Sequence, residues 1–139
     1  GPEIAGLKAF AGQKKIPVCW GGPESGLTDG EAEYRLTLPA DGLELTVGSY
    51  AALCFLAAAC VAVAARPAAG GLAALAVFNA AAVKARAGCK GPGSFAGRLL
   101  DALANLSYKE FKKIAGESLA AVGETELPAL DESPAESQE

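Results

Sequence analysis

The chain has 139 residues, a formal net charge of −4, and neither histidine nor methionine. The absence of histidine removes the commonest general base and the commonest metal ligand. The four cysteines lack the C-x-x-C spacing of zinc and iron–sulfur sites, and the sequence contains neither a P-loop nor a G-x-S-x-G motif. These absences predict a protein that is not an enzyme and that has no metal and no intrinsic cofactor.

Residues 1–32 contain Gly, Pro and Lys at short intervals and show little hydrophobic periodicity. This composition predicts an irregular N-terminal extension. The first residue is Gly1 rather than methionine. That start indicates either removal of a targeting peptide or the residues that a cleaved tag leaves behind.

Residues 33–47 predict a β-hairpin. Tyr34, Leu36 and Leu38 alternate with polar residues, and the segment 39–42 (Pro-Ala-Asp-Gly) has the chemistry of a turn. A second alternating run follows the turn. Because a two-stranded hairpin is marginally stable alone, we expect it to pack on its own helices or on another subunit.

Residues 45–84 predict a membrane region. The segment 45–65 has 21 residues without a charge, which as a helix spans about 30 Å, the thickness of a hydrocarbon core. The segment 67–83 is a second uncharged run and the expected second span. Both runs are rich in alanine, and small residues favour close helix contact in lipid. Either both runs cross the membrane as a hairpin, or only the first crosses and the second packs against protein.

The C-terminal third predicts helices followed by a tail. Residues 94–123 show two amphipathic stretches, with Ser94 as a cap of the first and a Ser107–Glu110 capping box at the start of the second. The segment 124–139 is acidic and contains prolines, so we expect it to be disordered in solution. The predicted fold class is therefore a mainly α membrane protein with one or two Ala-rich transmembrane helices.

Asn79 is a candidate functional residue, because it is a polar side chain in the second apolar run and polar residues inside a membrane span are candidates for function. It would either donate a hydrogen bond to a neighbouring helix or, as a low-ranking alternative, ligate a chlorophyll. Cys19 and Cys89 could form a disulfide if both lie on one oxidising side of a membrane.

These features together predict a non-catalytic accessory subunit of a large membrane complex. The expected setting is photosystem I with its antenna in the plastid thylakoid membrane, with chlorophyll or carotenoid at subunit interfaces. The expected partners are other subunits and the lipid bilayer. Nucleic acid is excluded because the basic residues of 84–113 interleave with a hydrophobic face rather than with exposed aromatics. Alternatives left open are a respiratory-complex subunit of the mitochondrial inner membrane, a soluble Ala-rich interaction domain, and a small-molecule or ion carrier.

Overall fold

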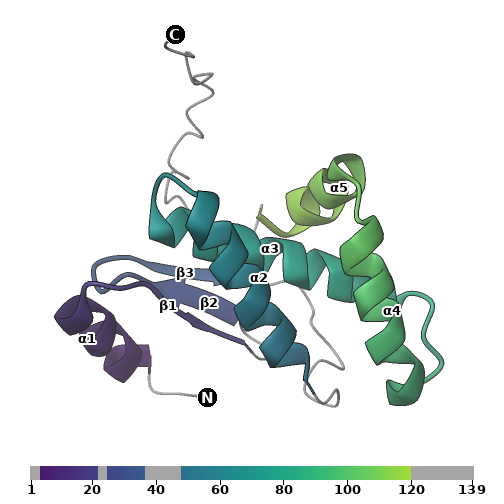
Figure 1. The fold of residues 1–139 in the computed structure, drawn as a ribbon, viewed down its shortest axis with the longest axis horizontal. Coiled ribbons are helices and arrows are strands. Elements are labelled where there is room, and N and C mark those ends of the chain that lie inside the picture. The colour runs from purple at the N-terminus through teal and green to yellow at the C-terminus, as the bar shows by residue number, and fades with distance from the viewer. Residues whose placement is uncertain (1–3, 22–24, 37–47, 120–139) are drawn as a thin grey trace, which may run out of the picture.

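The computed structural model describes residues 4–21, 25–36 and 48–119 (Figure 1). In these segments the chain folds into a small antiparallel sheet and five helices. The elements in order are α1 (Ile4–Lys14), β1 (Val18–Trp20), β2 (Ser25–Thr28), β3 (Glu33–Leu36), α2 (Ser49–Val63), α3 (Pro67–Arg86), α4 (Pro92–Asn105) and α5 (Tyr108–Leu119).

The sheet has the strand order β1-β2-β3, and both pairings are antiparallel. The turn between β2 and β3 is closed by Asp29, whose Oδ1 accepts the backbone N–H of Ala32 at 2.8 Å and of Glu31 at 3.0 Å. These bonds to the ionised carboxylate lower the pKa of Asp29, the Ala32 amide first among them. Side chains alternate across the strands, so Leu27 and Leu36 lie on the same face of the sheet.

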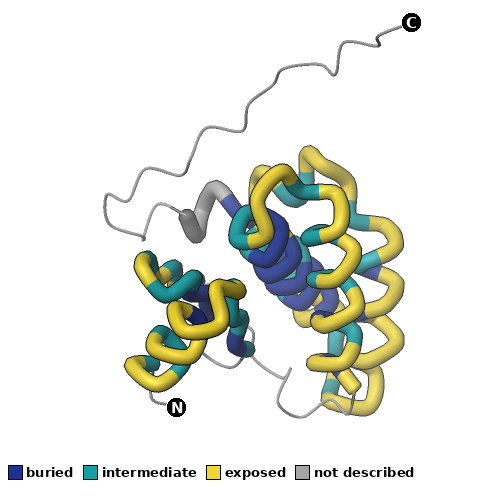
Figure 2. The backbone as a smooth tube through the Cα atoms, turned by 60° about the vertical axis from the view of Figure 1, so that its left-hand side comes forward, coloured by how far each residue is buried: buried dark blue, intermediate teal, exposed yellow. Residues whose placement is uncertain are grey.

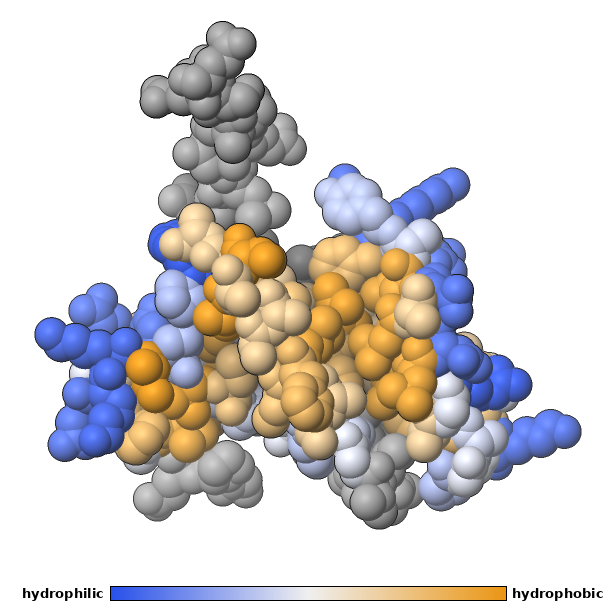
Figure 3. Space-filling model, viewed as in Figure 1, coloured by the Kyte–Doolittle hydropathy of each residue, from blue (hydrophilic) through white to orange (hydrophobic). Residues whose placement is uncertain are grey.

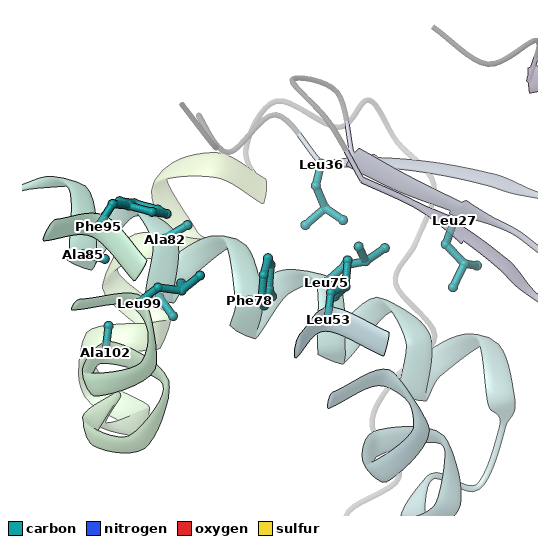
Figure 4. Close-up of a cluster of buried hydrophobic side chains, with 11 residues drawn as sticks. Leu27, Leu36, Leu53, Leu75, Phe78, Ala82, Ala85, Phe95, Leu99 and Ala102 are labelled. Atoms are coloured by element: carbon teal, nitrogen blue, oxygen red, sulfur yellow. The ribbon is translucent and has the colours of Figure 1, made fainter. Parts of the chain in front are cut away.

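Helix α3 is the core of the described structure. It packs on α2, on α4 and α5, and on strands β2 and β3. Most of the buried helical residues belong to α3, while the outer sides of the surrounding helices are exposed (Figure 2). Leu27 and Leu36 of the sheet point toward α3, and side chains of α4 meet it further along (Figure 4). The larger members of this cluster are Leu27, Leu36, Leu53, Leu75, Phe78, Phe95 and Leu99.

Glycine at position 70 lets helices α2 and α3 approach closely. A Cβ on Gly70 would lie 2.7 Å from the Val61 Cα and 2.8 Å from the Cys60 carbonyl oxygen, both of them backbone atoms of α2. Neither atom can move aside without shifting the helix. The abundance of small residues, which suggested helix contact in lipid, therefore serves a helix pair of an α/β domain.

A single lysine joins the last two helices to α3. Lys84 Nζ pairs with Glu110 Oε1 at 2.8 Å and donates to the Asn105 carbonyl oxygen at 3.1 Å. The capping box at the start of α5 is also formed, because Glu110 Oε2 accepts from the Ser107 N–H and hydroxyl. Hydrogen bonding from Lys84, and then from Ser107, lowers the pKa of Glu110 to about 2.

The prediction of a mainly α membrane protein is wrong. Helix α2 ends at Val63, and its 15 residues reach about 22 Å, which is short of the roughly 30 Å hydrocarbon core. Helix α3 has the length and mean hydropathy of a span, yet 56% of its apolar stretch is buried inside the protein. A helix that is apolar all round can be the core of a domain as well as a membrane span, and the contacts of α3 show the former.

Residues 1–32, expected to be irregular, contain α1, β1 and β2. Strands β1 and β2 were not predicted because three or four residues are too few to show hydrophobic periodicity. The first half of the expected 33–47 hairpin forms β3, whose described partner is β2; the segment 37–47 lies outside the described residues. Helices α4 and α5 occupy most of 94–123, and the acidic segment 124–139 lies outside the described residues. Cys19 and Cys89 are both free thiols.

Candidate functional site

The carboxyl ends of strands β1 and β3 lie at the same end of the sheet. Since β1 and β3 are both antiparallel to β2, they run in the same direction, and the register places Trp20 and Leu36 at the same end. In open α/β sheets with parallel strands, ligands bind outside the carboxyl ends of the strands; here β1 and β3 share that direction, and β2 between them runs the opposite way.

Helix α2 begins at this same end. Gly21, which directly follows β1, lies against α2: a Cβ there would be 2.5 Å from Cε1 of Tyr50 and 3.7 Å from Cδ2 of Leu53. The Tyr50 ring therefore covers the backbone at the carboxyl end of β1. Gly48 caps the helix with φ +85°, a left-handed conformation that glycine adopts without a steric penalty. The chain therefore turns sharply at Gly48 and enters α2 at Ser49.

The first turn of α2 has the electrostatics of an anion site. An α-helix leaves its first backbone N–H groups without intrahelical partners, and the helix dipole adds partial positive charge there. In the described structure no side chain caps the helix at Gly48, and the first turn contains no acidic residue. The Ser49 side chain stands at the first helical position and is 3% exposed. Backbone amides in this arrangement suit a phosphate oxygen.

A charged cleft of about 520 Å³ lies at the opposite end of the sheet. It is formed where the chain leaves α1, at the β2–β3 turn, and where α3 begins. Its lining contains two bases, Lys15 and Arg66, and two acids, Asp29 and Glu31. The Asp29 carboxylate already accepts the two backbone N–H groups of its own turn, so it serves the turn rather than a ligand.

Among the described residues, no three His, Cys, Asp or Glu side chains are grouped closely enough to hold a metal ion. Cys19 is a poor nucleophile, because burial, and then the neighbouring Cys54, raises its pKa to about 11. Asn79 is 1% exposed, and its Nδ2 has no hydrogen-bond partner in the described part of the chain. It lies in the protein core. Its role as a pigment ligand, and the presence of chlorophyll or carotenoid, stay untested predictions.

An α/β domain with an uncapped helix N-terminus at the carboxyl end of its strands has the features of a phosphate-handling enzyme domain. Comparison with known proteins agrees with that class: a sequence profile of the hydroxyethylthiazole kinase family matches residues 2–109. The chain belongs to the hydroxyethylthiazole kinase family, a family of thiamine-salvage enzymes.

Two relatives illustrate the match. The hydroxyethylthiazole kinase of Carboxydothermus hydrogenoformans is 42% identical over 91 residues, which are 63% of this chain and 34% of that kinase. The structure of a hydroxyethylthiazole kinase protein from Pyrococcus horikoshii OT3 superposes with a TM-score of 0.70 at 26% identity, over 76% of this chain and 41% of that one. The chain therefore spans well under half the length of either relative.

The family corrects the functional predictions. A non-catalytic subunit of a photosystem is wrong, because the family consists of enzymes. The thylakoid or mitochondrial membrane location is wrong for the same reason, as are the bilayer and membrane-complex partners. The sequence reading assigned Gly48 and Ser49 to an expected membrane span, because the uncharged run 45–65 includes both residues. The structure instead places a sharp turn at Gly48 and the first residue of α2 at Ser49.

Proposed function

We propose that this chain supplies the part of a hydroxyethylthiazole kinase that holds a phosphate group at the N-terminus of α2. The observation that carries the proposal is the family match over residues 2–109, which includes the whole of that helix start. The name of the relatives implies transfer of a phosphoryl group from a nucleoside triphosphate to the hydroxyl of a hydroxyethyl side chain. This chain matches 34% of the Carboxydothermus kinase and 41% of the Pyrococcus protein.

The chemistry of such a transfer requires stabilisation of negative charge. In phosphoryl transfer the protein mostly positions the reactants and neutralises charge on the phosphoryl oxygens. Gly48 makes no side-chain hydrogen bond to the first turn of α2, and the first N–H groups of a helix have no intrahelical partners. Backbone donors that are fixed in place before the reaction are effective because they need no reorganisation as charge develops. Magnesium accompanies the phosphates in kinases, and the protein usually supplies only one or two carboxylates to it, with phosphate oxygens and water as the other ligands.

A substitution at Gly48, the N-cap of α2, can test this proposal without adding a steric clash. A Cβ on Gly48 would meet nothing within 4 Å, so Gly48→Ala acts through the φ of +85° alone. The strain of about 1–2 kcal/mol would displace the first turn. Gly97→Ala is the matched control, because a Cβ there also meets nothing within 4 Å and the residue lies in α4.

The measurement is phosphate transfer from ATP to hydroxyethylthiazole. The 139-residue chain would be assayed alone and together with the portion of the Carboxydothermus kinase that it does not match. We expect Gly48→Ala to reduce the rate by about tenfold or more, as loss of a fixed oxyanion donor does, and Gly97→Ala to leave it unchanged. An unaffected rate in Gly48→Ala would exclude the α2 N-terminus as the phosphate site. Absence of transfer in both wild-type preparations would contradict the proposed function.

A further inference from the structure

The charged cleft of about 520 Å³ lies between the end of α1, the β2–β3 turn and the start of α3. Its volume is within the range of about 300–1,000 Å³ that is typical of small-molecule sites. The cleft is at the opposite end of the sheet from the start of α2, so the proposed phosphate site does not account for it. In space-filling view, hydrophilic side chains gather at the left edge of the molecule, where Figure 1 places α1, whereas an apolar band occupies the middle (Figure 3).

Two walls of this cleft are held against each other by a direct backbone contact. Gly30, in the β2–β3 turn, has a φ of +98°, and a Cβ there would lie 2.5 Å from the backbone nitrogen of Gly12 in α1. The Asp29 carboxylate fixes the same turn by accepting two backbone N–H groups. The shape of the cleft is therefore set by the packing of the backbone, as in a binding site that is formed before its ligand arrives.

Two basic side chains line the cleft from different elements. Lys15 follows α1, and Arg66 is the N-cap residue of α3. Within the part of the chain that the structure describes, neither side chain makes an ion pair or a hydrogen bond. The first turn of α3 has no side-chain cap and no acidic residue, and the first N–H groups of a helix have no intrahelical partners. Two unpaired cations beside these groups suit a phosphate.

The backbone of Lys15 indicates that its charge is kept at a cost in stability. Its φ is 55°, the left-handed conformation that glycine usually supplies after a helix. The Ile16 N–H donates to the Ala11 carbonyl oxygen at 3.3 Å, the bond that closes a helix in this way. A cation that complements the dipole of α1 is already present at Lys14. Because strained residues cluster at functional sites, Lys15 points to the same cleft independently of the shape of the cleft.

The acidic side of the cleft decides what kind of anion it accepts. The Asp29 carboxylate is occupied by its own turn, whereas the exposed Glu31 side chain has no hydrogen bond or ion pair in the described residues. We propose that the cleft binds a small phosphate monoester that also carries a cationic nitrogen. The phosphate lies against Lys15, Arg66 and the start of α3, and the nitrogen lies against Glu31. This inference is independent of the phosphate site proposed at α2.

The experiment measures binding of phosphoethanolamine, which carries a phosphate and an ammonium group at pH 7. Its matched control is ethyl phosphate, which lacks the ammonium group. Each compound is titrated into the 139-residue chain at constant ionic strength, and the backbone amide signals are followed by NMR. We expect saturable shifts at residues 12–16 and at Ala68, with phosphoethanolamine bound about two- to fivefold more tightly than ethyl phosphate. Glu31→Gln should abolish this preference.

Substitution of the two bases separates binding from stability. Arg66→Gln should weaken binding of phosphoethanolamine by about tenfold, as loss of a charge-assisted hydrogen bond does. Lys15→Gly should weaken binding to a similar extent and yet raise the melting temperature by a few degrees, because glycine relieves the left-handed strain. Lys90→Gln is the matched control, because Lys90 is an exposed base that does not line the cleft, and it should leave the affinity unchanged.

Four outcomes would overturn the proposal. They are a dissociation constant above about 10 mM for phosphoethanolamine, equal binding of the two compounds by the wild type, equal losses of affinity in the Lys90 and Arg66 variants, and unchanged binding in Lys15→Gly. Binding is read without phosphate transfer, so a chain that is inactive as a kinase would still test this inference.

Discussion

Helices α2 and α3 follow one another in the chain and have similar composition, yet they have different environments. Helix α3 is enclosed by α2, α4, α5 and the sheet, whereas α2 buries one side and exposes the other. Neither helix shows a polar stripe that would reveal which side faces water. The comparison teaches that an apolar composition alone does not tell how much of a helix the rest of the protein buries.

The largest expected difference between the two helices concerns their phenylalanines. Phe78 of α3 is 1% exposed and Phe55 of α2 is 79% exposed. We expect Phe78→Ala to reduce the free energy of unfolding by about 3–5 kcal/mol, because it leaves a cavity in a packed core. Phe55→Ala should change it by less than about 0.5 kcal/mol in the isolated chain. Urea titration followed by circular dichroism measures both, and comparable losses would remove the distinction between the helices.

The contact between the helices gives the next effect. Gly70→Ala places a Cβ against the backbone of α2 at 2.7 Å, and we expect it to destabilise the chain by about 1–3 kcal/mol. Gly97→Ala, on the open side of α4, should stabilise it by up to about 1 kcal/mol, because alanine favours the helix over glycine. Thermal unfolding of the two variants checks the signs. A Gly70→Ala variant as stable as the wild type would mean that the helices are not in close contact.

The ion pair of Lys84 and Glu110 should give a smaller, pH-dependent effect. The folded pKa of Glu110 lies at about 2, below its ordinary value of 4.5. A carboxylate with a depressed folded pKa contributes stability that is fully present above the unfolded pKa and is lost as the pH falls through the folded pKa. Glu110→Gln should therefore lower the melting temperature at pH 7, and its difference from the wild type should shrink between pH 4.5 and pH 2. Because the pair is exposed, we expect a shift of a few degrees at most.

The last prediction concerns the reactivity of two cysteine thiols and not the stability of the fold. Cys54 of α2 is exposed, whereas Cys19 is half-buried with a pKa of about 11. At pH 8 roughly one Cys19 thiol in a thousand is therefore ionised. We expect a thiol reagent to modify Cys54 before Cys19, and Cys54→Ala to remove the fastest phase of the reaction. A fast phase that is lost instead in Cys19→Ala would show that the interior beneath α2 opens readily.

Parts of this structure were predictable from local sequence, and others were not. The capping box of Ser107 and Glu110 and the amphipathic stripe around Phe95 and Leu99 follow from spacing within single helices, and both helices are present. The assignment of α2 and α3 to a membrane failed because burial by protein and burial by lipid select the same residues. The phosphate site proposed at Gly48 was also not predicted, since a helix N-terminus is recognised from the strand ends around it rather than from a motif.

The order in which these elements pack has a consequence for how the chain folds. Neighbours in space are mostly neighbours in sequence: the strands follow one another as a meander, α2 packs on α3, and α3 packs on α4. Mixed α/β domains fold at rates between those of helical bundles, which take about microseconds to milliseconds, and those of all-β folds, which take about milliseconds to seconds. We expect the strands and the helices to form as two local units. The slow step is then their docking, which brings Leu27 and Leu75 into one hydrophobic cluster.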